Sequence, residues 1–298
     1  MSHKFRFSKE SRERLKNFLL GDKHKPKEEA PAQEAEMPQP QAEAVSAAQA
    51  ETAPAKAPGK SIAVVTRTDI GKMRKTNQDA VIESQELRLF GVADGMGGHN
   101  GGETASAGAR DGLLELLEGK SPEQGALRTA IGAVNRRLFL QQKGDEQLSG
   151  MGTTLTALWL SDSCVYIGHV GDSRAYRLRD GEMKQMTDDH SVVAELLRSG
   201  MLTPEQAATH PMRNVITRAV GTEEGIEIDL LCEERRAGDL WLVCSDGLYG
   251  MVGDEKIAEI LKAHKPKKAA DLLIAAALEG GGRDNISLVI LLDKEGEQ

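Results

Sequence analysis

Residues 89–95 read LFGVADG, an apolar run that ends at Asp94 beside Gly95. A strand would fix the position of the acid, and the glycine would let the chain turn sharply after it. Three further acids lie next to an apolar run in a similar way. Asp246 follows such a run and precedes a glycine, Asp172 follows a run that ends in glycine, and Asp284 stands just before the last apolar run. A single Asp-Gly pair is typical of an ordinary turn. Its repetition predicts that acids far apart in the sequence meet at one end of the strands.

Such a group of acids has a chemical use. Several carboxylates brought together repel one another strongly unless cations lie between them. Hard divalent cations such as Mg²⁺ and Mn²⁺ prefer carboxylate, carbonyl and water oxygens as ligands. The pattern therefore favours a divalent metal site formed by these acids.

Charge is distributed unevenly along the 298 residues. The net charge is −8, but residues 1–27 carry nine Lys/Arg against three Asp/Glu, whereas the remainder holds 29 basic and 43 acidic residues. An acidic body repels nucleic-acid phosphates, so we expect no nucleic-acid partner. An acidic centre would instead collect cations.

The composition predicts three segments. Residues 1–27 form a basic tail, in which Phe7, Leu15, Phe18 and Leu19 could share one face of a short helix. The tail could be merely solubilising, dock on a partner protein, or lie on a membrane surface. Residues 28–60 are rich in Ala, Pro, Glu and Gln and are interpreted as a disordered linker. Residues 61–298 form one folded domain.

Three cysteines, Cys164, Cys232 and Cys244, occur without a C-x-x-C pair, which indicates free thiols rather than a zinc site or a disulfide framework. No apolar run is long enough for a transmembrane segment, and the N-terminus lacks a signal-peptide core. We therefore expect a cytoplasmic protein, and we expect a monomer.

The domain mixes strands and helices in segregated groups, which indicates an α+β fold with separate layers. Strands are predicted at Ile62–Arg67, Leu87–Ala93, Thr153–Leu160, Cys164–Val170, Leu240–Cys244 and Ile286–Leu292. Helices are predicted at Glu103–Leu117, Ala126–Gln142, Ser191–Ser199, Glu255–Ala263 and Lys267–Glu279.

A series of short motifs appears in a fixed order from Thr66 to about Leu292. They are RKTNQD (74–79), DGMGGH (94–99), GE (102–103), GTT (152–154), GDSR (171–174), DHS (189–191), NVITRAVG (214–221), SDG (245–247) and DN (284–285). In this order the chain resembles the metal-dependent protein phosphatases of the protein phosphatase 2C type, the PPM family, and in particular its bacterial members. The first 60 residues lie outside the resemblance.

The resemblance implies a four-layer α-β-β-α sandwich of two antiparallel sheets flanked by helices, with a two-metal site at one end. By motif, Asp94 would bridge both cations and the Gly95 carbonyl would bind one of them. Asp246 and Asp284 would complete the shell of the other cation, and Asp172 would help hold a third, weaker one. Arg74 would grip the substrate phosphate, and Asp79 would order the water.

The resemblance also implies an activity. The chain would be a serine/threonine protein phosphatase that uses two Mn²⁺ or Mg²⁺ ions to activate a bridging water against phosphoserine or phosphothreonine, opposing a bacterial-type Ser/Thr kinase. Phosphorylated proteins would be its substrates. The alternatives are a non-catalytic regulator that binds phosphoproteins on the same fold, or a hydrolase of small phosphoesters.

The sequence departs from the animal enzymes at two places. Met96 stands where they have a histidine proposed as the general acid, and that role is not transferred to His99, for which we expect a structural role in the turn. Gln78 stands where they often have glutamate. Of the other motif residues, we expect His169 to be structural, Ser191 to cap a helix, and Thr153 and Thr154 to pack near the site.

Overall fold

The computed structural model describes residues 61–97 and 101–294. The predictions for the basic tail, the linker and His99 lie outside the described residues. Among the described helices, none is both long enough and apolar enough to cross a membrane.

The described strands form two sheets, and their strand pairs are antiparallel. The first sheet has the order β1 (Ile62–Asp69), β11 (Ile286–Asp293), β10 (Leu240–Cys244), β7 (Arg174–Arg179) and β8 (Glu182–Gln185). The second has the order β2 (Asp79–Ser84), β3 (Leu89–Met96), β5 (Leu155–Leu160), β6 (Cys164–Val170) and β9 (Asp229–Glu234), with the short β4 (Gly152–Thr153) beside β3.

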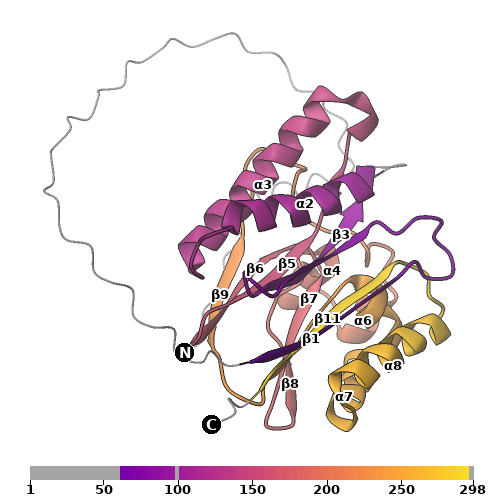
Figure 1. Cartoon of the computed structure of the whole chain (residues 1–298). Helices are drawn as coiled ribbons and strands as arrows, with labels where there is room; N and C mark the ends of the chain where they lie inside the picture. The colour runs from indigo at the N-terminus through magenta and orange to yellow at the C-terminus, as the bar shows by residue number, and fades with distance from the viewer. Residues whose placement is uncertain (1–60, 98–100, 295–298) are drawn as a thin grey trace, which may run out of the picture. The chain divides into compact units, whose positions relative to one another are not determined.

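Helices cover the outer faces of both sheets. α2 (Gly101–Leu117) and α3 (Gln124–Gly144) lie on one side, and α7 (Asp254–Ala263) and α8 (Pro266–Glu279) on the other, as Figure 1 shows. α6 (Asp246–Val252) contacts α8 and β11. The connection between β8 and β9 contains α4 (Val192–Arg198) and α5 (Pro204–Ala208), and a 3₁₀ turn spans Glu146–Leu148.

Three buried apolar clusters separate the layers. One lies between α2, α3 and the second sheet, and includes Leu113, Ile131 and Trp159. A second lies between the first sheet and helices α6 to α8, and includes Leu242, Ile257 and Leu273. The third joins residues of both sheets, such as Leu158 and Val243, so the sheets pack face to face. The α-β-β-α sandwich is thereby confirmed.

Alternation along the central strands explains how one sheet contributes to two cores. On β3, Leu89 and Ala93 belong to the helix-facing cluster, whereas Phe90 and Val92 belong to the cluster between the sheets. Successive side chains of a strand point to opposite faces. A central strand of this sandwich is therefore apolar at nearly every position, which is the pattern visible in the sequence.

Most predicted elements are present, and two strand predictions need correction. β3 does not stop before Asp94 but runs on to Met96, so Asp94 and Gly95 lie within the strand. The predicted strand Thr153–Leu160 is interrupted at Thr154, where the side-chain hydroxyl accepts a hydrogen bond from the Asp94 amide at 2.9 Å. Both departures occur where the second sheet carries the acids.

We predict that Leu158→Ala lowers the free energy of unfolding by about 2–5 kcal/mol, since it opens a cavity between the sheets where Leu158 is fully buried. The control Leu140→Ala, on α3 with the leucine 56 % exposed, should change stability by less than about 0.5 kcal/mol. Urea unfolding followed by circular dichroism measures both. Equal losses in the two variants would contradict the assignment of the inter-sheet core.

Candidate active site

Strand register brings the predicted acids to one end of the sandwich. Asp79 at the start of β2 is directly opposite Asp94 of β3. β10 and β11 are antiparallel, with Cys244 opposite Leu288, so Asp246 after β10 and Asp284 before β11 lie at the same end of that pair. Each acid is thus positioned by a strand whose central residues are buried.

Asp172 joins the group through the neighbouring strands. It follows β6, whose Val170 is opposite Leu155 at the start of β5. The Thr154 hydroxyl accepts a hydrogen bond from the Asp94 amide at 2.9 Å and shares one of 2.7 Å with the Ser173 hydroxyl. Thr154 therefore ties the strand that carries Asp94 to the loop that carries Asp172, in line with the packing role expected for it.

We call these five carboxylates the acidic cluster: Asp79, Asp94, Asp172, Asp246 and Asp284. Burial raises the pKa of Asp94 well above its usual range, and the negative charges of the four other acids raise it further. Burial likewise raises the pKa of Asp246 to about 8, with the charges of Asp172, Asp284 and Asp79 adding to the rise. The charge of Asp246 also contributes to the raised pKa of Asp94, so these two carboxyls lie near one another.

The two remaining shifted acids follow the same physics. Burial raises the pKa of Asp172 to about 6, and the charge of Asp189 adds to the rise. Burial also raises the pKa of Asp79 to about 6, although hydrogen bonds with Ser287 and Ser245 lower it. Such shifts record carboxylates that are dehydrated and face like charges, an arrangement that a divalent cation would relieve.

Two buried atoms indicate where cations would fit. Asp79 Oδ1 and Asp246 Oδ1 are buried without a hydrogen-bond partner in the part of the chain that the structure describes. A buried carboxylate oxygen without a donor is costly, and metal coordination is one way to satisfy it. Within residues 61–97 and 101–294, no three His, Cys, Asp or Glu side chains are already arranged around a single ion position. The acids are gathered, but their oxygens do not form a closed shell.

Gly95 is required by close backbone packing and not by a turn. Its amide donates a hydrogen bond to the Gln78 carbonyl at 3.0 Å. A Cβ at this position would collide with the carbonyl oxygens of Gly102 and Gln78. The absence of a side chain keeps β2, β3 and the first turn of α2 together at the acidic cluster.

Arg74 faces the acidic cluster from the loop between β1 and β2. Its NH2 donates to Asp284 Oδ2 at 2.7 Å, and its side chain is 49 % exposed. The hydrogen bond with Asp284 raises the pKa of Arg74, and the charges of Asp94 and Asp246 contribute in the same direction. A guanidinium has five N–H donors, so this contact leaves donors for an anion arriving from solvent.

Asn285 holds the loop that carries Arg74, a role that sequence reasoning did not assign. Its Nδ2 donates to the Ile70 and Thr76 carbonyls, both at 3.0 Å, and its Oδ1 accepts from the Gln78 amide at 2.8 Å. The three bonds bracket residues 70–78. The DN motif therefore supplies a candidate ligand, Asp284, and then the anchor for the arginine loop.

Two serines between the sheets were also missed. The Ser245 hydroxyl donates to Asp79 Oδ2 at 2.8 Å and accepts from the Ser287 amide at 3.0 Å. Asp79 is therefore oriented by the first sheet although it belongs to the second. The only sequence signal for this role was the position of Ser245 within the SDG motif.

The expected structural roles of two motif residues agree with their contacts. His169 is fully buried, with ring nitrogens 2.8 Å from the Thr156 hydroxyl and 3.0 Å from the Asp188 carbonyl. Burial lowers the pKa of His169 to about 3, so it stays neutral. Ser191 caps α4, its hydroxyl accepting from the Ala194 amide.

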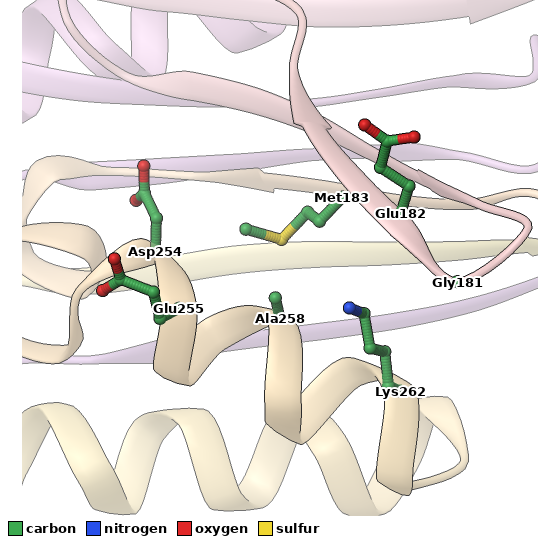
Figure 2. Close-up of a pocket in the computed structure, with 7 residues that line it drawn as sticks. All are labelled: Gly181, Glu182, Met183, Asp254, Glu255, Ala258 and Lys262. Atoms are coloured by element: carbon green, nitrogen blue, oxygen red, sulfur yellow. The ribbon is translucent and has the colours of Figure 1, made fainter.

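A separate pocket of about 320 Å³ lies between the β7–β8 hairpin and α7. Figure 2 shows its lining, with Asp254 and Glu255 at one end and Lys262 at the other. No predicted site residue lines it. The chemistry suggested by the acidic cluster therefore belongs elsewhere on the domain.

The chain is similar in sequence to known proteins over most of its length. A family model described as protein phosphatase 2C matches residues 72–273. The serine/threonine phosphatase stp of Listeria innocua is 40 % identical over 239 residues, which cover 76 % of this chain and 93 % of that protein. The serine/threonine protein phosphatase PstP of Mycobacterium tuberculosis is 42 % identical over 226 residues, which cover 75 % of this chain and 43 % of PstP.

Solved structures give the same result. The crystal structure of the M. tuberculosis phosphatase PstP/Ppp superimposes with a TM-score of 0.74 at 40 % identity, covering 78 % of this chain and 99 % of that one. A structure of the PstP catalytic domain in complex with two manganese ions gives a TM-score of 0.73 at 38 % identity, with the same coverage. The chain belongs to the protein phosphatase 2C family.

We predict that Asn285→Ala speeds hydrogen exchange at the Gln78 amide, because that amide loses its acceptor and the loop loses its anchors. Exchange at Gly221 should stay slow, since its amide donates to a different side chain, Asn135. The control Asn135→Ala should give the opposite pattern. Exchange followed by NMR tests this, and protection at Gln78 that survives Asn285→Ala would contradict the anchoring role.

Proposed function

We propose that this chain hydrolyses phosphoserine and phosphothreonine in proteins with the help of two divalent cations, Mn²⁺ or Mg²⁺. The observation that carries the proposal is the acidic cluster, in which two buried carboxylate oxygens are left without donors beside an exposed arginine. Membership of the protein phosphatase 2C family supports the same reaction, as does the manganese pair in the related PstP structure.

Residues of the acidic cluster would hold the cations. Asp94 is the candidate bridge between two ions, with the Gly95 carbonyl on one and Asp246 and Asp284 on the other. Asp172 is the candidate ligand of a third, weaker ion. When bound, the cations would lower the pKa of a shared water and neutralise charge on the phosphoryl group. Asp79, oriented by Ser245, would accept hydrogen bonds from water at the edge of the site.

Arg74 is the candidate phosphate-binding residue. A guanidinium can bind two phosphate oxygens at once, which fixes the orientation of the phosphoryl group as well as its charge. The loop that carries Arg74 is fixed by Asn285, so the guanidinium lies at a defined place beside the acids. Its ion pair with Asp284 would place the phosphate next to a candidate metal ligand.

A non-catalytic regulator on the same fold is the second candidate. It would be expected to lack an acid of the cluster or the arginine, whereas all five acids and Arg74 are present here. A hydrolase of small phosphoesters shares the chemistry and differs in substrate. Direct assay with both substrate classes separates these candidates.

The cellular setting is part of the proposal. The enzyme would act as a monomer in the cytoplasm and oppose a bacterial-type Ser/Thr kinase in signal transduction. The described cysteines are free thiols, which is compatible with a reducing compartment. Residues 1–27 would be a basic tail that solubilises the chain, docks on a partner protein or lies on a membrane surface. Residues 28–60 would link this tail to the catalytic domain at residues 61–298.

We predict Mn²⁺-dependent release of phosphate from a phosphothreonine peptide, abolished by a chelator. Asp246→Asn should lower kcat/KM more than about 100-fold, because even the loss of an outer partner of a metal site costs about 10- to 100-fold. Asp271→Asn is the matched control, since this aspartate pairs with Arg67 on the surface. Colorimetric phosphate release measures all three proteins.

Two outcomes would contradict the proposal. If the Asp246→Asn variant were as active as the Asp271→Asn variant, Asp246 would not be part of the active site. A wild-type enzyme that hydrolyses small phosphoesters but leaves phosphopeptides intact would favour the metabolite hydrolase.

We also predict that deletion of residues 1–60 leaves kcat and KM for a phosphopeptide unchanged, because every candidate site residue lies beyond Ser61. Localisation or the capture of a partner protein should change instead. Steady-state kinetics of the truncated and full chains checks the first part. A large fall in kcat would show that the tail belongs to the catalytic unit.

A further inference from the structure

Arg174 makes an unusual set of contacts just beyond the acidic cluster. It is the first residue of β7 and lies two residues after Asp172. Its Nε donates a hydrogen bond to Asp189 Oδ1 at 2.9 Å, and its Nη2 donates one to Asp189 Oδ2 at 2.7 Å. The side chains of Arg174 and Asp189 are 19 % and 12 % exposed. A largely buried, bidentate ion pair of this kind fixes the plane of the guanidinium.

The fixed guanidinium stacks on Tyr249. Its central carbon lies 3.7 Å from the centre of the Tyr249 ring, within the range of a cation–π contact. The Tyr249 hydroxyl donates a hydrogen bond of 3.0 Å to the carbonyl oxygen of Asp172. Tyr249 belongs to α6, the helix that begins at Asp246. Arg174 therefore supports the Tyr249 ring, which links the helix that carries Asp246 to the main chain of Asp172.

A third contact links Arg174 to the surface. Its NH1 lies 3.0 Å from the Tyr176 hydroxyl and 3.3 Å from Asp254 Oδ1, and the same hydroxyl donates to Asp254 at 2.9 Å. Asp254 begins α7 and stands at the edge of the pocket in Figure 2. The guanidinium is thus held by Asp189 on one side and by Asp254 and Tyr176 on another.

The Asp172 loop needs such support. Gly171 has a φ of +107°, a backbone conformation that other residues rarely adopt, so the chain turns sharply just before the acid. The Gly171 amide donates to His190 Nδ1 at 3.0 Å on one side of the loop, and Tyr249 holds the Asp172 carbonyl on the other. Without these bonds, a carboxylate facing four like charges would move away from them.

We propose that Arg174 is a positioning residue that fixes the Asp172 main chain through Tyr249, and thereby sets the affinity of the acidic cluster for its cations. This inference rests on the proposed function of the cluster. Arg174 makes no hydrogen bond or ion pair with a cluster carboxylate, so its contact with the Asp172 loop runs through Tyr249. Its charge also offsets part of the rise that burial causes in the pKa of Asp172, and an Arg174→Lys variant keeps that charge while it loses the stacked fork. Lysine cannot replace it, because an ammonium group lacks both the planar fork and the stacking surface.

The chain offers a matched control on the same strand. Arg177 is 16 % exposed, pairs with Glu233 at 2.7 Å, and lies 6.0 Å from the centre of the Trp241 ring. It therefore combines an ion pair and an aromatic neighbour as Arg174 does. Among the described residues, its side chain pairs with Glu233 and faces Trp241, and it bonds neither Tyr249 nor Asp172.

The test compares the full-length wild-type chain with Arg174→Lys, Tyr249→Phe, the double variant and Arg177→Lys. Mn²⁺ binding to metal-free protein is measured by calorimetry, and phosphopeptide hydrolysis is measured over a range of Mn²⁺ concentrations. We expect Arg174→Lys and Tyr249→Phe each to weaken Mn²⁺ binding about 10- to 100-fold, with kcat largely restored by excess Mn²⁺. The double variant should be no worse than either single one, because both remove the same support.

Four results would overturn the proposal. They are unchanged Mn²⁺ affinity in Arg174→Lys, additive losses in the double variant, an equal loss in Arg177→Lys, and a fall in activity that excess Mn²⁺ does not restore. The last of these would mean that Arg174 serves only general stability. Failure of the proposed function would give a different result. A wild-type chain that binds Mn²⁺ but releases no phosphate would contradict the proposed phosphatase activity. The calorimetric comparison of the variants would still decide the role of Arg174.

Discussion

The constraint on which the rest of this structure depends is the gathering of five carboxylates at one end of a sandwich. Burial raises the pKa of four of them, and the side chain of the fifth, Asp284, is partly exposed. Like charges without water repel one another, and the raised pKa values of Asp94 and Asp246 record that repulsion. The fold holds the acids in place through neutral hydroxyls: Thr154 binds the main-chain amide of Asp94, and Ser245 binds the carboxylate of Asp79. The side-chain amide of Asn285 fixes the neighbouring loop through the Gln78 amide. A cation between the acids would turn repulsion into attraction, so the frame is most easily understood as a support for metal ions.

The parts of the fold that the sequence predicted best are those buried on both faces. β6 and β10 have the predicted bounds, because an apolar run closed by Gly, Asp or Ser leaves little choice of ends. β2, β7, β8 and β9 were missed because charged and polar residues interrupt or dominate their sequences. RAYRLR on β7, for example, holds three arginines, whose charges are met by acids from distant elements. α6 was missed because its sequence, DGLYGMV, opens with a pair typical of a turn.

The candidate site also has parts that could be predicted from the sequence and parts that could not. Ordered motifs identified the acids, Gly95 and Arg74, and the structure brings all five acids and the arginine to one place, while their individual roles stay predictions. The residues that orient them could not be predicted, since each contact joins distant positions. Ser245 reaches Asp79 across 166 residues, and Asn285 reaches Gln78 across 207. The contact between Arg174 of β7 and Tyr249 of α6 likewise depends on how these two elements pack together.

The account is tested most directly by a crystal structure of the full chain grown with Mn²⁺, with data collected at the manganese absorption edge. We predict two anomalous peaks within the acidic cluster, both in contact with Asp94 and one of them also with Asp246 and Asp284. Any weaker third peak should lie beside Asp172. Peaks elsewhere on the domain, or none within reach of Asp94 and Asp246, would contradict the claim that the acidic cluster holds metal ions.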